Sequence, residues 1–317
     1  MSGKPIILSV VAASLLALSL VPVSGKAQGS GRGFQVSGPW VSFYGTASRM
    51  GDLKRVARTF RILNIDADPE SDTDLDSGNF TRAQISLLKN GGRNRVLSYL
   101  NIGSCESTRT YWRTVPAGYL PAGHFALGAY AGYPDEQWMD LSSLDYQNLI
   151  VNYVAARLVA SGVDGFYLDN LELVEHTPSD ANGPCRAACR QGGLDLVRKL
   201  RAKYPNLLLV MQNATGDVTR LGRTGGTEFP TLLDGISHEE VYEPRTDPDA
   251  EAELKAWREM KLTPGGRLFW IATEDYVGSR AAVTRARSAY ARSRAQGFSP
   301  YVSDASAGQG RVFYWGF

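Results

Sequence analysis

Short apolar runs alternate with amphipathic stretches along almost the whole chain, and this alternation is the strongest constraint on the fold. Eight runs rich in β-branched and aromatic residues have the length of strands. Strands that alternate with helices form parallel sheets, and eight such units predict a closed (β/α)8 barrel, a single α/β domain of the TIM-barrel class. The expected strands are Trp40–Gly45, Phe60–Asp66, Arg95–Ile102, Gly165–Asn170, Leu207–Asn213, Leu232–Tyr242, Leu268–Asp275 and Phe298–Ser303.

Helical patterns lie between these strands. In Tyr146–Ala160 the apolar residues recur with the 3.6-residue period of a helix that covers a sheet. The alternative is an open, doubly wound sheet, which would normally carry a glycine-rich phosphate turn after its first strand. No G-x-G-x-x-G follows Trp40–Gly45, which favours the barrel. The other expected helices are Leu53–Arg58, Ala83–Leu88, Gly193–Lys203, Val218–Leu221, Ala250–Met260 and Ala281–Ala295.

The N-terminus is typical of an export signal. Lys4 precedes an apolar run from Ile6 to Val21, and small residues follow where a signal peptidase would cut. The run is shorter than the roughly 20 residues that a spanning helix needs, so an uncleaved anchor is the weaker alternative. We expect a signal peptide over residues 1–27, a flexible leader over 28–38 and a catalytic domain over 39–317. The mature protein would then be secreted or periplasmic, with no membrane association.

Charge and cysteine content exclude several functions. The chain has 34 basic and 32 acidic residues and no concentrated basic block, so we expect no nucleic-acid partner. Cys185 and Cys189 could pair with each other, or either could pair with Cys105. With three histidines and neither H-x-H nor H-E-x-x-H, we expect no metal and no cofactor. A G-x-S-x-G elbow for a serine hydrolase is also missing.

Polar residues gather at the ends of the expected strands. A parallel barrel carries its site at the carboxyl ends of its strands, and alternate side chains of each strand point inward. Asp169 and Glu239 end the fourth and sixth strands and could face each other across the mouth. Two carboxylates that flank one bond are the minimal machinery for glycoside hydrolysis, although a single Asp in such a place is more often a cap or an ion-pair partner. The other residues expected to point inward near the strand ends are Asp66, Tyr99, Asn101, Met211, Asn213, Thr273 and Asp275.

Aromatic residues crowd the long stretch from Gly103 to Ser143, between the third strand and its helix. Trp138 and Tyr133 are among them. Loops of this length in compact domains are commonly functional, and aromatic rings commonly serve as sugar platforms. Packing over the barrel top is an equally good explanation for each ring taken singly. We select Trp138 as a candidate substrate-binding residue.

Four motifs resemble those of the glycoside hydrolase family 114 proteins. The run Val96–Glu106, followed by Arg109 and Tyr111–Trp112, resembles YLSIGEAE-x-YR-x-YW. Gln137–Asp140 resembles E-x-W-L-D, Val163–Asn170 resembles G-x-DGVFLDN-x-D, and Leu233–Glu239 resembles DGV-x-x-E. The motifs occur in order between Trp40 and Val302.

This resemblance implies an endo-α-1,4-polygalactosaminidase on a (β/α)8 barrel that acts on a cationic, galactosamine-rich exopolysaccharide. Its two catalytic acids would be Asp169 and Glu239, and its cleft positions would include Asp66, Tyr99, Glu106 and Tyr276. The chain departs from the motifs at Ser104, where Glu is common, and at Glu172, where Asp is frequent.

The sequence therefore predicts a monomeric hydrolase that binds a polysaccharide in an acid-lined cleft. We expect a retaining mechanism with Asp169 as the nucleophile and Glu239 as the acid/base, with the reverse assignment of the two roles as the alternative. The separation of the two carboxyl groups would decide between retention and inversion. Two alternatives stay open: a barrel that binds carbohydrate without cleaving it, and a glycosidase for a different α-galactoside linkage.

Overall fold

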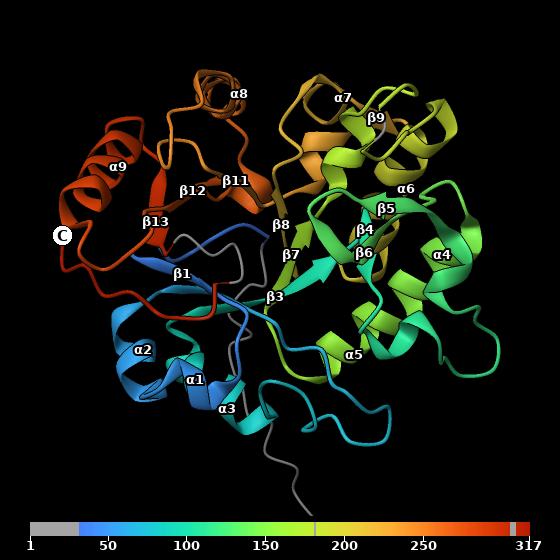
Figure 1. The fold of residues 1–317 in the computed structure, drawn as a ribbon, viewed down its shortest axis with the longest axis horizontal. Helices are drawn as coiled ribbons and strands as arrows, with labels where there is room; N and C mark the ends of the chain where they lie inside the picture. Colours follow the sequence, from blue (N-terminus) through green and yellow to red (C-terminus); the bar gives the residue numbers. More distant parts are fainter. Residues whose placement is uncertain (1–31, 181, 305–308) are drawn as a thin grey trace, which may run out of the picture. The chain divides into compact units, whose positions relative to one another are not determined.

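The structure is a computed structural model that describes residues 32–180, 182–304 and 309–317. Within these residues eight strands form one parallel sheet (Figure 1). The Trp40 indole nitrogen on β1 donates to the backbone oxygen of Ser299 on β13 at 2.8 Å, and the two end strands lie side by side, so the sheet closes into a barrel. In sheet order the strands are β1 (Trp40–Phe43), β2 (Ile62–Ile65), β3 (Arg95–Asn101), β7 (Gly165–Asp169), β8 (Leu208–Gln212), β11 (Gly235–Glu239), β12 (Trp270–Tyr276) and β13 (Ser299–Ser303).

Helices surround the sheet (Figure 1). Several begin at polar caps: the Asp52 side chain accepts the amides of Lys54 and Arg55 at the start of α2, and Thr81 and Gln84 form a capping box at the start of α3. Each predicted strand and helix overlaps an observed one, and the predicted TIM-barrel class is confirmed. The helices are α1 (Ala47–Met50), α2 (Leu53–Thr59), α3 (Arg82–Leu88), α4 (Leu144–Asn148), a π-helical stretch (Leu149–Val154) that leads into α5 (Ala155–Ala160), α6 (Ala187–Lys203), α7 (Asp217–Arg220), α8 (Pro248–Glu259) and α9 (Val283–Ala295).

The predicted signal peptide, residues 1–27, lies outside the described residues, as do residues 28–31 of the predicted leader. Among the helices of the described residues, none has both the length and the apolar character needed to span a membrane.

The stretch from Gly103 to Ser143 is not the loop that the sequence suggested. It folds into a three-stranded antiparallel sheet in the order β4 (Ser104–Glu106), β6 (Tyr133–Met139), β5 (Ala126–Tyr130). In Figure 1 this small sheet lies in front of the ends of β3 and β7. The hairpin between β5 and β6 is tied down by Asn182, whose side-chain oxygen accepts the Ala131 amide and the Trp138 indole N–H, each at 2.9 Å.

The amino-terminal half of the barrel is filled by aromatic side chains. The Trp40 ring lies 5.3 Å from Trp270, 5.6 Å from Tyr301 and 6.4 Å from Tyr167 between ring centroids, and all four residues are buried. Side chains closer to the carboxyl ends of the strands are polar, as the Asn64 amide shows by donating to the Ser42 hydroxyl at 3.1 Å. The apolar plug closes one end of the barrel and leaves the other end for chemistry.

The strand register corrects two of the predicted inward faces. Gly235 of β11 pairs with Val210 on one side and with Trp270 on the other, so Val210 and Trp270 share the inward face. Glu274 and Tyr276 therefore point inward, whereas Met211, Thr273 and Asp275 do not. Thr273 hydrogen-bonds Ser293 of α9 at 2.8 Å, and Asp275 accepts the amides of Tyr242 and Glu243 at 2.6 and 2.9 Å. Alternation counted from the expected end of a strand gives the wrong face here, because it takes no account of how the strand pairs with its neighbours.

Two acids tie neighbouring strands together at the opposite end of the barrel. Asp234 directly precedes β11 and is fully buried. Its carboxylate accepts from the Arg201 guanidinium at 2.5 Å and from the Leu209 amide at 2.9 Å. Asp164 stands in the same place before β7, where it accepts the Val96 amide at 2.9 Å.

Loss of the Asp234 carboxylate should destabilise the fold strongly. Asp234→Ala leaves the Arg201 charge buried without its partner, which costs about 3–5 kcal/mol of unfolding free energy. Urea unfolding measures this cost. The matched control is Glu228→Gln, which removes an exposed partner of Arg223 and should cost about 0–1 kcal/mol. Equal effects of the two substitutions would contradict a structural role for the Asp234 pair.

Candidate active site

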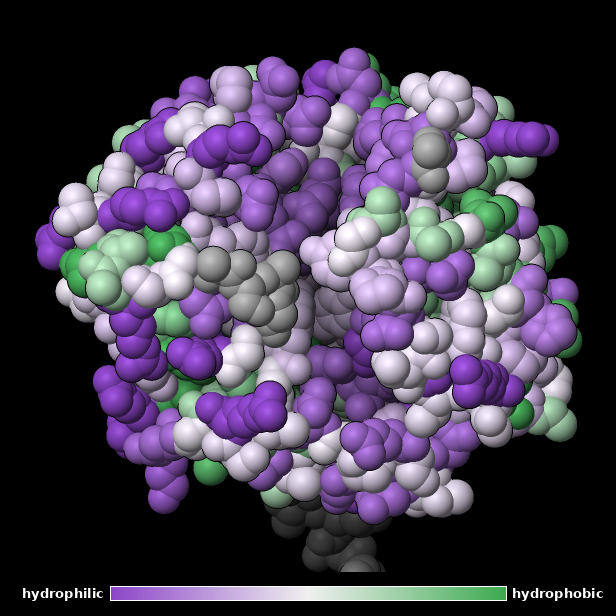
Figure 2. Space-filling view, viewed as in Figure 1, coloured by the Kyte–Doolittle hydropathy of each residue, from purple (hydrophilic) through white to green (hydrophobic). Residues whose placement is uncertain are grey.

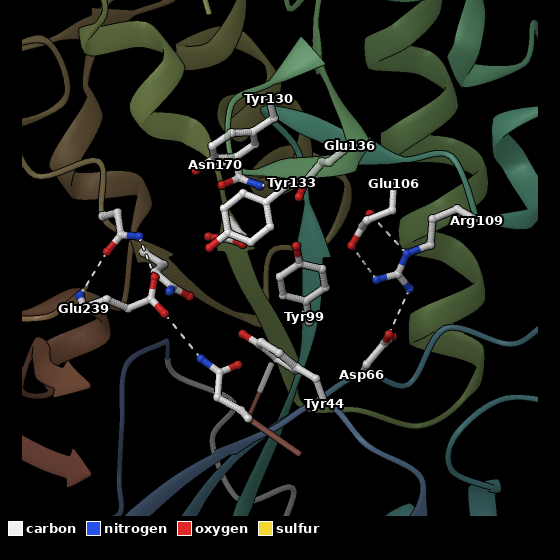
Figure 3. A pocket seen from close by; sticks show the side chains of 14 residues that line it. Tyr44, Asp66, Tyr99, Glu106, Arg109, Tyr130, Tyr133, Glu136, Asn170 and Glu239 are labelled. Carbon is white, nitrogen blue, oxygen red and sulfur yellow. Dashed lines mark hydrogen bonds and ion pairs between the residues drawn. The ribbon is translucent and has the colours of Figure 1, made fainter. Parts of the chain in front are cut away.

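A pocket of about 370 Å³ lies at the carboxyl ends of the barrel strands. In Figure 2 this face of the molecule is hollowed near its centre, and the hollow is lined mainly by hydrophilic residues. Side chains from the ends of β3, β7, β8 and β11 meet there with others from the small antiparallel sheet (Figure 3). The lining residues are Tyr44, Asp66, Tyr99, Glu106, Arg109, Tyr130, Tyr133, Glu136, Asp169, Asn170, Gln212, Asn213, Glu239 and Gln309.

Asp169 and Glu239 share this pocket. Asp169 is the last residue of β7 and Glu239 the last residue of β11, and β8 is the strand hydrogen-bonded between those two. Both side chains lie on the inward face and both line the pocket. The backbone ladder thus carries the two predicted catalytic acids into one cavity.

The Glu239 carboxylate is held on both oxygens by neutral donors. The Asn213 amide donates to Oε2 at 2.8 Å, while its own oxygen accepts the Glu239 backbone amide at 3.0 Å. The Tyr276 hydroxyl and the Gln309 amide, the latter at 3.3 Å, donate to Oε1, and Gln309 also donates to the Tyr276 hydroxyl at 2.6 Å. These contacts fix the orientation of the carboxylate from three separate segments of the chain.

Asp169 lies among other acids. Burial raises its pKa well above the ordinary value, and the negative charges of Glu172, Glu239 and Glu136 raise the pKa further, against a hydrogen bond from Tyr99. Shifts of this kind, produced by burial and like charges in a cleft, are typical of functional carboxyls. A cation in the pocket would favour the ionised form of Asp169 because opposite charges lower the pKa of an acid.

Four of the predicted substrate-binding residues line the pocket beside this pair: Asp66, Tyr99, Glu106 and Asn213. Two of them are ion-paired with Arg109, whose guanidinium lies 2.9 Å from an oxygen of Asp66 and 2.9 Å from an oxygen of Glu106. Burial alone would raise the pKa of Glu106, but the charge and hydrogen bonds of Arg109 lower it overall. On one side of the pocket Arg109 therefore balances Asp66 and Glu106 (Figure 3). Asp169 instead has other acids as its charged neighbours.

The other three predicted residues lie behind the pocket surface. Asn101 and Tyr276 are buried and hydrogen-bond lining residues, namely Glu136 and Glu239. Trp138 is also buried, and its ring stacks at 4.1 Å on Tyr130, which lines the pocket. These three side chains contact residues that line the pocket and do not line it themselves.

Several lining residues were not selected from the sequence. Tyr44 continues the inward alternation of Trp40 and Ser42 and could have been found by that pattern. Gln212 was not selected because the expected alternation in β8 placed Met211, and not Gln212, on the inward face. Gln309 follows the last strand, and no sequence pattern near it indicates a place in the pocket. The lining residues that had not been selected are Tyr44, Arg109, Tyr130, Tyr133, Glu136, Asn170, Gln212 and Gln309.

The structure shows which cysteines pair, and none of the three lines the pocket. Cys185 and Cys189 form a disulfide, with Cα atoms 5.3 Å apart, at the start of α6. Cys105 on β4 is a buried free thiol.

Glu172 should make stability depend on pH. Burial, followed by the charges of Glu239 and Glu136, raises its pKa from 4.5 to about 8. Between these two values the folded chain binds more protons than the unfolded chain, so stability falls as the pH rises through this window. Glu172→Gln cannot ionise, and at pH 9 it should be more stable than the original protein by on the order of 2–4 kcal/mol, with a much smaller difference at pH 5. Urea unfolding at both pH values tests this; a difference that does not change with pH would contradict it.

Sequence comparison places the chain among two curated relatives and one family. An uncharacterised protein of Thermotoga maritima is 22% identical over 235 residues, which cover 72% of this chain and 70% of the relative. An uncharacterised protein of Deinococcus radiodurans is 27% identical over 224 residues, covering 67% of this chain and 64% of the relative. Glycoside-hydrolase family GH114 matches residues 47–316.

Solved structures share the fold. The glycoside hydrolase domain of PelA from Pseudomonas aeruginosa superposes with a TM-score of 0.60 at 18% identity, covering 87% of this chain and 99% of that domain. TtGalA, an α-galactosidase from Thermus thermophilus solved with stachyose, superposes with a TM-score of 0.51 at 15% identity, covering 87% of this chain and 63% of that protein. The match over residues 47–316, together with two acids that share a barrel-mouth pocket, shows that the chain belongs to glycoside-hydrolase family GH114.

Proposed function

We propose that the protein is an exported, monomeric, endo-acting hydrolase of α-1,4-linked, galactosamine-containing polysaccharide, and that Asp169 and Glu239 carry the reaction. One observation carries the proposal: the two acids end strands that are separated by a single strand and line one pocket. Paired carboxylates around one sugar are the machinery of glycoside hydrolysis. Export rests on the apolar N-terminal run alone.

The proposed mechanism is retaining. The Asp169 carboxylate attacks the anomeric carbon, the bond from that carbon to the glycosidic oxygen breaks, and Glu239 gives its proton to the leaving oxygen. The resulting glycosyl ester on Asp169 is then hydrolysed by water, which loses a proton to Glu239 as its oxygen attacks the anomeric carbon. Asp169 leaves as a carboxylate, and both acids return to their starting states.

A cationic substrate fits the electrostatics of this pair. Burial and the neighbouring acids raise the pKa of Asp169, yet a nucleophile must be ionised. The ammonium group of a deacetylated amino sugar would favour that ionised form when it enters the pocket, because an opposite charge lowers the pKa of a carboxyl. A neutral sugar would bring no such charge. This difference favours galactosamine over neutral galactosides as the substrate.

Removal of either acid should stop turnover without unfolding the barrel, because both side chains lie in the pocket. Asp169→Asn and Glu239→Gln should each lower kcat on galactosamine oligosaccharides by about 10²–10⁴-fold or more. An aryl glycoside with a good leaving group needs little protonation, so it should restore the first step in Glu239→Gln and not in Asp169→Asn. Reducing ends and released phenol are the measured products.

The control for these variants is Glu240→Gln, which removes an exposed carboxylate next to Glu239 that does not line the pocket. It should keep the activity of the original protein. Near-full activity of Asp169→Asn or Glu239→Gln would refute the assigned pair. Saturable polymer binding without new reducing ends from the original protein would mean that the barrel binds carbohydrate and does not cleave it.

Tyr133 is placed to carry a sugar ring at the mouth. Its side chain is 46% exposed, lines the pocket at the turn of the β5–β6 hairpin and lies 4.9 Å from the Tyr130 ring between centroids (Figure 3). Tyr133→Ala removes that flat apolar surface and should raise KM about 10-fold, a loss of roughly 1.4 kcal/mol in binding, with a smaller change in kcat. Tyr133→Phe keeps the ring and should behave like the original protein. Steady-state kinetics on oligosaccharides distinguish the two outcomes, and an equal KM for all three proteins would contradict the stacking role.

A further inference from the structure

The acid-rich side of the pocket contains one carboxylate that the proposed mechanism does not use. We propose that Glu136 binds the ammonium group at C2 of the sugar that Asp169 attacks, and that it thereby selects deacetylated galactosamine over N-acetylgalactosamine. This inference rests on the proposed function and adds a residue that determines specificity.

Glu136 is a buried side chain with a fixed geometry. It belongs to β6, opposite Glu106 of β4, and is 8% exposed. Its Oε1 accepts the Asn101 amide at 2.7 Å, the Asn170 amide at 2.9 Å and the Ser104 hydroxyl. Three donors on one oxygen leave the carboxylate little rotational freedom.

The second oxygen of Glu136 is left for a ligand. Within the described residues every donor to this side chain goes to Oε1, no cation pairs with it, and Glu136 lines the pocket. A carboxylate oxygen that a bound sugar covers is costly to desolvate unless a donor or a cation meets it. An ammonium group supplies both a charge and three donors.

The contacts of Glu136 also place it near Asp169, which attacks the anomeric carbon in the proposed mechanism. Asn101 is the register partner of Asp169, and Asn170 follows Asp169 in the chain, so the side chains that hold Glu136 come from the same strand ends that carry the nucleophile. In a 2-amino sugar the nitrogen is on C2, one bond from the anomeric carbon. A carboxylate next to Asp169 is therefore in the right place to meet it.

The other acids are less suited to this role. Glu106 is neutralised by Arg109, and Glu172 does not line the pocket. Glu239 has donors on both oxygens and is assigned to proton transfer. Glu136 combines a place in the lining, a fixed orientation and an oxygen without a partner.

Ser104 makes the pairing specific to this chain. It occupies the motif position where the resemblance leads us to expect Glu, and here its hydroxyl donates to Glu136. A second carboxylate in that place would repel Glu136 instead of orienting it. With Ser at position 104, the Glu136 carboxylate has no second acid at this position, and its three donors are all neutral.

The test compares fully deacetylated α-1,4-galactosamine oligosaccharides with their N-acetylated counterparts. In Glu136→Gln the ratio of kcat/KM for the deacetylated over the acetylated substrate should fall by about 10- to 100-fold, the value of a hydrogen bond to a charged group. The loss should appear mainly in the deacetylated substrate. Glu240→Gln removes an equal charge outside the pocket and should leave the ratio unchanged.

Ser104→Ala gives a second measurement that keeps the charge of Glu136 and removes one of its three donors. The ratio should fall here too, by a smaller factor of up to about 10. Equal losses on both substrates, or an unchanged ratio in both variants, would overturn the role of Glu136. Failure of the original protein to cleave either substrate would overturn the proposed function itself, which is a separate result.

Discussion

The hydrogen-bonded register between parallel strands is the constraint on which the site depends. It sets Asp169 level with Asn101 on β3 and Glu239 level with Glu274 on β12. Because the barrel is closed, residues that end different strands are brought round to the same cavity, although they are far apart in the chain. The positions of the two acids are therefore determined by backbone pairing, and loops contribute the surrounding wall.

A barrel mouth that collects this many acids needs some way to reduce their repulsion, and three ways occur in this pocket. Arg109 balances the acids on one side by direct ion pairs. Neutral amides and hydroxyls from several segments solvate other carboxylates without adding charge. In the third way, burial and neighbouring negative charges raise the pKa of an acid and so disfavour its ionised form. Arg109 pairs with Asp66 and Glu106. Neutral donors hold Glu136 and Glu239, and the raised pKa values are those of Asp169 and Glu172.

The elements and the central pair were predictable because they depend on local patterns. In β7 the alternation of Gly165, Tyr167 and Asp169 gives the inward face directly, since the whole strand is short and regular. The same counting failed in β12, because the inward face there is set by pairing with β11 and not by the end of the apolar run. Gln309 reaches Glu239 from beyond the last strand, a contact that only the closed tertiary structure creates. Sequence patterns report periodicity well and report contacts between distant segments poorly.

The uneven distribution of charge across the pocket gives the proposed substrate an orientation as well as a class. Around Arg109 each acid already has a cation, so an ammonium group gains little there. Around Asp169 burial and the neighbouring acids raise the pKa of the carboxyl, and a cation there would favour its ionised form. An amino-sugar polymer carries one ammonium per deacetylated unit, and the unit that gains most from its charge is the one whose C2 nitrogen lies on the Asp169 side. Binding strength and correct placement for attack then come from the same interaction, which is the condition for binding energy to accelerate a reaction instead of only holding the substrate.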